Sequence, residues 1–63
     1  MKVFIERENK HIELTSKNGI ELLKSLQINP AEVLLIKNDE VVLPEEELED
    51  SDSIQILSVV SGG

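Results

Sequence analysis

The residues that most clearly indicate a chemical role are the last two of this 63-residue chain, Gly62 and Gly63. They follow the strand-like apolar run 54–60, with only Ser61 between. Because glycine has no β-carbon, such an end is sterically open and adopts backbone conformations that other residues avoid. We expect it to pass through a narrow channel and to present the carboxylate of Gly63 for chemistry.

Other reactive side chains lack the partners that a catalytic or metal site needs. His11 is the only histidine and the chain has no cysteine, so a surface histidine fits better than a metal ligand or a general base. Asp50 and Asp52 begin like a calcium loop, but the glycine and glutamate that complete an EF-hand are missing, and we interpret them as turn residues. Without a nucleophile–base pair or a phosphate-binding loop, the chain is not predicted to be an autonomous enzyme.

Composition excludes further classes of function. The formal net charge is −7, from 13 acidic and 6 basic residues, whereas nucleic-acid binding needs clustered lysine and arginine. A single phenylalanine, without tryptophan or tyrosine, leaves no platform for stacking bases. The acidic surface either attracts a basic protein partner or simply keeps the domain soluble. The lysines are explained by solubility as well as by a role as conjugation acceptors: Lys2, Lys10, Lys17, Lys24 and Lys37.

The size and the apolar content indicate one small domain. A chain of this length buries only about 60% of its unfolded surface, and without cysteine it has neither disulfides nor thiolate zinc sites to stabilise it. No apolar run reaches the ~18 residues of a membrane span. Glu6 and Glu8 interrupt the N-terminus too early for a signal peptide. We therefore expect a cytoplasmic protein with no membrane contact.

The first half of the chain predicts a hairpin followed by a helix. Alternation around Val3 and Ile5 indicates a strand, residues 8–10 a turn, and alternation around Ile12 and Leu14 a second strand. Apolar residues then recur at helical spacing over 18–26. We expect Ser16 or Asn18 to cap this helix, Gly19 to weaken its start, and the pair Asn29 and Pro30 to end it.

The second half predicts three more strands. The run 33–36 is short, branched and apolar on both faces, which is typical of a central or parallel strand. A turn at 38–40 leads to a short strand at 41–42, and the final strand covers 53–59. Between them lies the acidic run 45–50, in which Leu48 is positioned to anchor a loop or short helix to the core.

This order predicts an α+β fold in which a mixed sheet of four to five strands wraps around one main helix. We expect residues 1–60 to form this single domain. We expect residues 61–63 to form a flexible C-terminal tail that ends in Gly-Gly.

Three segments, 37–42, 48–54 and 59–63, carry a resemblance to a known family. The chain resembles the ubiquitin-like β-grasp proteins, and within them the small sulfur carriers related to ThiS and MoaD, with the archaeal ubiquitin-like modifiers close to these. It departs from the family pattern at Ser51, where a turn glycine is common; if that position needs a positive φ, the serine is strained. It also lacks the aromatic residues of molybdopterin-synthase small subunits and the arginines that precede Gly-Gly in ubiquitin.

The resemblance implies a carrier on which other enzymes act. An E1-like enzyme uses ATP to adenylate the carboxylate of Gly63, and sulfur from a persulfide donor then converts it to a thiocarboxylate. That sulfur serves a synthase or target in thiamine, molybdopterin or tRNA thiolation, and the carrier itself holds no cofactor. Alternatively, a lysine of a target protein attacks the activated carbonyl, which makes the chain a ubiquitin-like modifier. A third reading, a non-catalytic regulatory binding domain with an inert tail, also stays open.

Strand alternation predicts an exposed apolar patch for the partner enzyme. With Val3 and Ile5 facing the core, the side chain of Phe4 faces outward. If Leu34 and Ile36 face the core, the same alternation predicts that the side chain of Leu35 faces outward. Two alternatives give no patch. The exposed apolar residues are scattered over the surface, or the strand alternates in the opposite phase and Phe4 lies in the core. The expected partner-binding residues are Phe4, Leu35, Leu57, Val59, Val60 and Ser61, and Gly62 gives the partner's channel access to Gly63.

Overall fold

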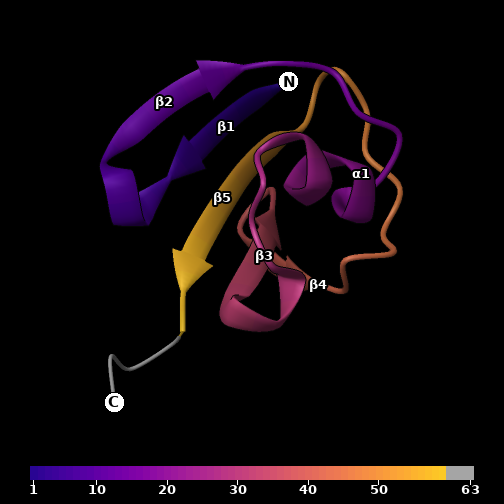
Figure 1. The fold of residues 1–63 in the computed structure, drawn as a ribbon. Coiled ribbons are helices and arrows are strands. Elements are labelled where there is room, and N and C mark those ends of the chain that lie inside the picture. Colours follow the sequence, from indigo (N-terminus) through magenta and orange to yellow (C-terminus); the bar gives the residue numbers. More distant parts are fainter. Residues whose placement is uncertain (60–63) are drawn as a thin grey trace.

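The computed structural model describes residues 1–59 of the chain. Five strands, one α-helix and two short 3₁₀ helices follow one another along this part of the sequence (Figure 1). In chain order they are β1 (Lys2–Ile5), η1 (Glu6–Glu8), β2 (Lys10–Glu13), α1 (Gly19–Ser25), η2 (Pro30–Glu32), β3 (Val33–Lys37), β4 (Glu40–Val42) and β5 (Ser53–Ser58). The predicted order of strands and helix is confirmed.

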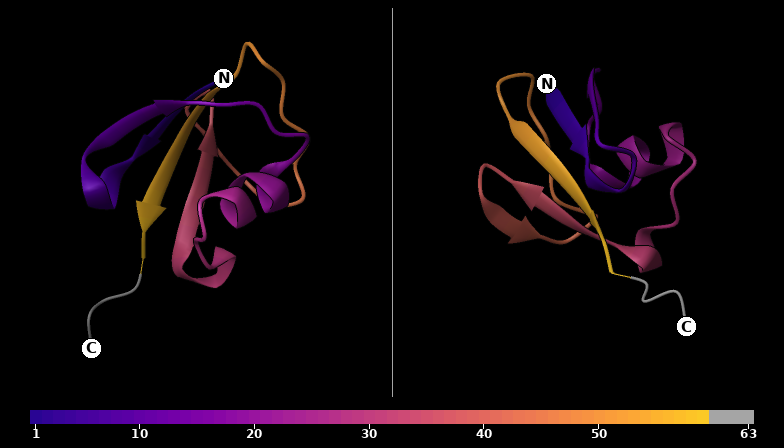
Figure 2. Two further views of the ribbon diagram at one scale, coloured as in Figure 1. Left: turned by 45° about the horizontal axis from the view of Figure 1, so that its top comes forward. Right: turned by 90° about the vertical axis from the view of Figure 1, so that its left-hand side faces the viewer.

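The strands form one mixed sheet in the order β2-β1-β5-β3-β4. β1 and β5 run parallel at its centre, and the pairs β1–β2, β3–β4 and β3–β5 are antiparallel. The apolar strand β3 is therefore an inner strand, with antiparallel neighbours on both sides. Helix α1 lies against one side of this sheet (Figure 2). This is the expected ubiquitin-like β-grasp arrangement.

The start of α1 shows which residues allow the helix to form. Asn18, and not Ser16, is the cap: its side-chain oxygen accepts a hydrogen bond of 2.9 Å from the backbone N–H of Glu21. A β-carbon on Gly19 would meet the side chain of Leu35 and would lie 2.5 Å from the carbonyl oxygen of Pro44. Glycine is thus required here by close packing, although it is a poor helix former.

The core lies between α1 and the inner face of the sheet. Leu22 and Leu23 of the helix are fully buried against it. Leu48 is also buried, which confirms that this leucine anchors the acidic segment before β5. The buried apolar residues are Met1, Val3, Ile5, Leu22, Leu23, Ile28, Leu35, Leu48, Ile54 and Ile56. Neither α1 nor a 3₁₀ helix in residues 1–59 is long and apolar enough to cross a bilayer.

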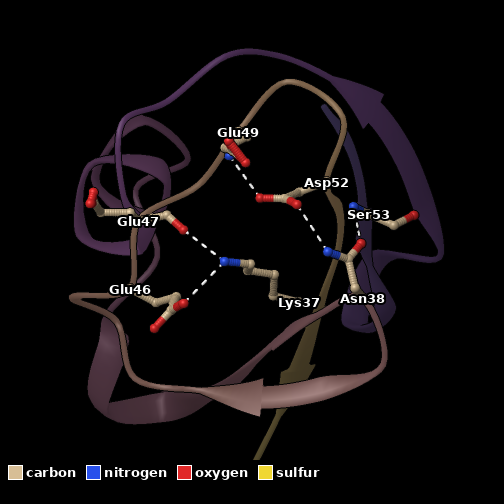
Figure 3. A network of polar contacts seen from close by, with 7 residues as sticks. All are labelled: Lys37, Asn38, Glu46, Glu47, Glu49, Asp52 and Ser53. Atoms are coloured by element: carbon tan, nitrogen blue, oxygen red, sulfur yellow. Dashed lines mark hydrogen bonds and ion pairs between the residues drawn. The ribbon is translucent and has the colours of Figure 1, made fainter.

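A polar clasp holds the start of β5 (Figure 3). We define it as Asn38, Asp52 and the backbone of Glu49 and Ser53. The carboxylate of Asp52 accepts a 2.7 Å hydrogen bond from the N–H of Glu49 and a 2.9 Å bond from the side-chain amide of Asn38. The side-chain oxygen of Asn38 accepts a 3.0 Å bond from the N–H of Ser53. These bonds hold the pKa of Asp52 below its usual range, with the Glu49 N–H as the largest cause and the Asn38 amide next.

The turn that contains Ser51 closes without the strain that a serine at positive φ would carry. The N–H of Asp52 donates to the carbonyl of Glu49 at 3.0 Å, as in an ordinary four-residue turn. Positive φ angles outside glycine occur elsewhere among the described residues, at Asn9, Gln27, Asn38 and Asp39. Serine therefore fits this position, and Asp52 acts as the turn residue that the sequence predicted.

Candidate functional site: the outer sheet face and the exit of the last strand

The last strand occupies the middle of the sheet and leads directly toward the C-terminus. β5 lies between β1 and β3, and its ladder continues one residue further because the N–H of Val59 donates to the carbonyl of Glu32 at 2.9 Å. The chain is thus fixed to the domain as far as Val59. Four residues with predicted roles lie outside the described part of the chain: Val60, Ser61, Gly62 and Gly63. The predicted boundary between domain and tail also lies there, and it stays a prediction.

One row of side chains crosses the outer face of the sheet, on the side away from α1. In the strand register, Phe4 is paired with Gln55, Gln55 with Ile36, and Ile36 with Val41. Paired residues share a face of the sheet. Phe4 and Ile36 are half-buried and Val41 is 64% exposed. The outward orientation expected for Phe4 is confirmed.

A second row lies nearer the exit of β5. Leu57 is paired with Leu34, which is 42% exposed, and Val59 follows on the same parity at 49% exposure. Together the two rows form an apolar surface that runs to the point where the chain leaves the sheet. We call it the outer apolar patch, and its residues are Phe4, Leu34, Ile36, Val41, Leu57 and Val59.

The prediction for Leu35 is wrong. Its side chain is only 2% exposed, and it is paired with the fully buried Ile56 on the inner face. Consequently Leu34 and Ile36, which we expected to face inward, lie on the outer face. The cause is the run 33–36 itself: an uninterrupted apolar strand gives no alternation from which to read its phase. The turn at Asn38 and Asp39 pairs Ile36 with Val41 and so puts both on one face, but this pairing does not determine which face.

His11 lies at the margin of the outer face, on the edge strand β2. Its ring and that of Phe4 are 4.5 Å apart between centroids and tilted by 32°. The two rings, with Ile36, Gln55 and neighbouring polar residues, line an open concavity of about 800 Å³. His11 is exposed, as predicted for a surface histidine. Within residues 1–59, no group of histidine, aspartate and glutamate side chains is arranged to hold a metal ion.

Charge collects at the opposite end of β5 from Val59. The acidic segment that precedes β5 lies at the far end of this strand from the exit (Figure 1). Within that segment, Glu46 is bound by Lys37, whose ammonium donates 3.0 Å hydrogen bonds to the Glu46 carboxylate and to the Glu47 carbonyl. The bond to Glu46 raises the pKa of Lys37. The apolar surface and the main acidic surface are therefore separate.

Comparison with known proteins agrees with this architecture. The model of the ThiS family matches residues 2–63. The sulfur carrier protein TtuB of Thermus thermophilus is 32% identical over 57 residues, which cover 89% of this chain and 88% of TtuB. An uncharacterized protein of Archaeoglobus fulgidus is 28% identical over 61 residues, which cover 97% of this chain and 90% of that protein. With a family match over nearly its whole length and a β-grasp fold, the chain belongs to the ThiS family.

Proposed function

We propose that this protein is a sulfur carrier and that its reactive group is the carboxylate of Gly63. One observation carries the proposal: the ThiS-family match extends through residue 63 and so includes the terminal pair of glycines. Val59, which follows the central strand β5, is held to the domain by the hydrogen bond that its N–H donates to the carbonyl of Glu32, and the glycine pair begins three residues later in the sequence. The relative named as a sulfur carrier, TtuB, supports the same role.

The chemistry begins with a carboxylate that is a poor acyl donor, because its leaving group would be an oxide. An activating enzyme of the E1-like type overcomes this: the Gly63 carboxylate attacks the α-phosphorus of ATP, pyrophosphate leaves, and an acyl-adenylate forms. A persulfide sulfur then attacks the acyl carbon and AMP leaves. A thiol cleaves the resulting acyl disulfide, which frees a thiocarboxylate on Gly63 and oxidises the thiol. The carrier is a co-substrate in each step, and ATP binds to the partner.

The two glycines suit this role for steric reasons. A β-carbon at position 62 or 63 would restrict φ and ψ and would crowd the approach to the acyl carbon inside a narrow channel. We propose that the catalytic groups belong to the activating enzyme. We expect the encounter to occur in the cytoplasm.

The outer apolar patch is the surface that we propose for docking this enzyme. Its second row, Leu34 and Leu57, lies next to Val59, so a partner bound there would also be placed next to the residue at which the described chain ends. Contiguous exposed apolar surface commonly marks a protein interface. We include Val60 and Ser61 as the residues that follow the patch into the partner.

Mass spectrometry of the protein isolated from its own cells tests the proposal. We expect a fraction of molecules in which one oxygen of the terminal carboxylate is replaced by sulfur, located to Gly63 by digestion. An isopeptide bond from Gly63 to a lysine of another protein would show a modifier instead. An unmodified terminus in cells that contain an active E1-like enzyme would point to a regulatory binding domain.

Gly63→Ala tests the steric requirement directly. We expect ATP–pyrophosphate exchange by the activating enzyme to fall to background, because the added methyl group lies next to the reacting carbon. Lys24→Ala, which changes an exposed residue of α1 outside the expected partner-binding set, serves as the control and should retain exchange. Normal adenylation of Gly63→Ala would contradict the proposed role of the terminal glycine.

A further inference from the structure

The edge strand β2 offers unpaired backbone groups to a second strand. β2 lies at one end of the sheet and, among residues 1–59, is paired with β1 alone (Figure 1). At the start of this ladder, Met1 and Leu14 exchange hydrogen bonds: the N–H of Leu14 donates at 3.1 Å and the terminal amine of Met1 at 2.8 Å. Because bonded and non-bonded pairs alternate in an antiparallel ladder, Ile12 bonds to β1 while the N–H and C=O groups of His11 and Glu13 point away from the sheet.

We propose that β2 pairs antiparallel with β2 of a second copy of this chain, in a register centred on Ile12. In this register His11 of each copy lies opposite Glu13 of the other. Each of the two symmetric pairs exchanges both of its outward N–H···O bonds. The two sheets thus join into one continuous sheet, and the half-buried Ile12 side chains of the two copies meet on its inner face.

Charge selects this register among those that two-fold symmetry permits. Centring on His11 would place two histidines opposite each other, and centring on Glu13 would place two carboxylates opposite each other. Centring on Ile12 instead places an imidazole, whose ring N–H can donate a hydrogen bond, against a carboxylate in both pairs, so that no two carboxylates face each other. Within each copy, the neighbouring strand β1 supports this pairing, because Lys2 lies opposite Glu13 and Phe4 lies opposite His11. Opposite charges in directly paired positions stabilise a sheet, and like charges destabilise it.

The other edge strand, β4, is less suited to such pairing. The N–H of Asn38 donates to the carbonyl of Ser53 at 2.8 Å, which directs the polar groups of Ile36 toward β5 and, by alternation, those of Val41 toward the open edge. Beyond Val41, the carbonyl of Leu43 is already bound by the N–H of Glu46 at 3.0 Å. β4 therefore offers one residue where β2 offers two.

This association is independent of the proposed function. β2 lies two strands away from β5, so pairing through β2 covers neither the exit at Val59 nor the second row of the outer apolar patch. A dimer formed in this way would present two separate carrier ends.

A charge swap across the pair tests the proposal. Sedimentation equilibrium and ¹⁵N NMR, recorded on dilution from millimolar to micromolar protein, should show a monomer–dimer equilibrium with shift changes centred on the amides of His11 and Glu13. His11→Glu places two glutamates opposite each other twice per dimer and should raise the dissociation constant about tenfold. The same variant with Glu13→Lys added restores opposite charges and should return the dissociation constant to near the original value.

Glu13→Pro provides a test of the backbone bonds. It removes an N–H that points to the open edge, a place where proline is tolerated in sheets, and it should abolish dimerisation while the NMR spectrum keeps the β1–β2 hairpin. Leu43→Lys, an exposed residue that follows β4 on the opposite edge, is the matched control and should leave the equilibrium unchanged. The proposal is overturned if dilution moves no amide of β2, if the shifts centre on Val41, or if the double charge swap binds no better than His11→Glu alone.

Discussion

Both faces of the sheet carry aliphatic side chains, but the two faces differ in what covers these side chains. On the inner face, Leu35 and Ile56 are buried under α1. On the outer face, their neighbours Leu34 and Leu57 lie in the next row of the same two strands, and Leu34 is 42% exposed. Composition does not distinguish these leucines, since each is an aliphatic residue in a β-strand. Their roles follow from the register, which decides the face on which each side chain stands.

Truncating one leucine on each face gives the largest expected effect. Leu35→Ala leaves a cavity between α1 and the sheet, and we expect a loss of about 2–5 kcal/mol in the free energy of unfolding. Leu34→Ala removes a side chain that is already in contact with water and should change it by no more than ~0.5 kcal/mol. Urea denaturation followed by circular dichroism measures both variants. Equal destabilisation would contradict the assignment of the two faces.

Whether the sequence alone predicts the face on which a side chain lies depends on the strand. In β1, the charged residues Lys2 and Glu6 occupy one set of alternating positions, so the sequence correctly predicts that Val3 and Ile5 lie on the inner face. β3 is apolar at four consecutive positions, and its phase is decided by pairing with β5, a partner that lies about twenty residues away in sequence. The local pattern of apolar and polar residues therefore does not determine which side chains of β3 face the core.

Two further features cannot be predicted from the sequence, because each depends on a contact between residues far apart in the chain. The requirement for glycine at Gly19 arises from the carbonyl of Pro44, and the bond between Asn38 and Asp52 spans 14 residues of sequence. Neither contact leaves a local pattern. By contrast, the cap at Asn18 and the anchoring by Leu48 follow from local chemistry and were predicted, the cap as one of two candidates.

A charge placed on the outer face tests whether that face binds the activating enzyme. Leu57→Asp puts a carboxylate at the centre of the outer apolar patch near the exit of β5. We expect affinity for the enzyme to fall at least about tenfold, because an unpaired charge would be buried on docking, while the fold is retained. Isothermal titration calorimetry measures the affinity. Ser53→Asp, on the same face and strand but at the far end from Val59, is the matched control; an equal loss there would show a general charge effect.

The smallest effect concerns the polar clasp, which stabilises the sheet at its rim and belongs to neither face. The hydrogen bonds to Asp52 favour its charged form, so its pKa is lower in the folded protein than in the unfolded chain. Such a group contributes stability at pH values above its unfolded pKa of about 4, and this contribution is lost as the pH falls through the lower folded value. Asp52→Asn should therefore lower the melting temperature at neutral pH, and the difference from the unchanged protein should shrink below pH ~4. Glu45→Gln, which removes an exposed carboxylate outside the clasp, is the control. A difference that stays constant from neutral to acidic pH would mean that Asp52 acts through its shape and not through its charge.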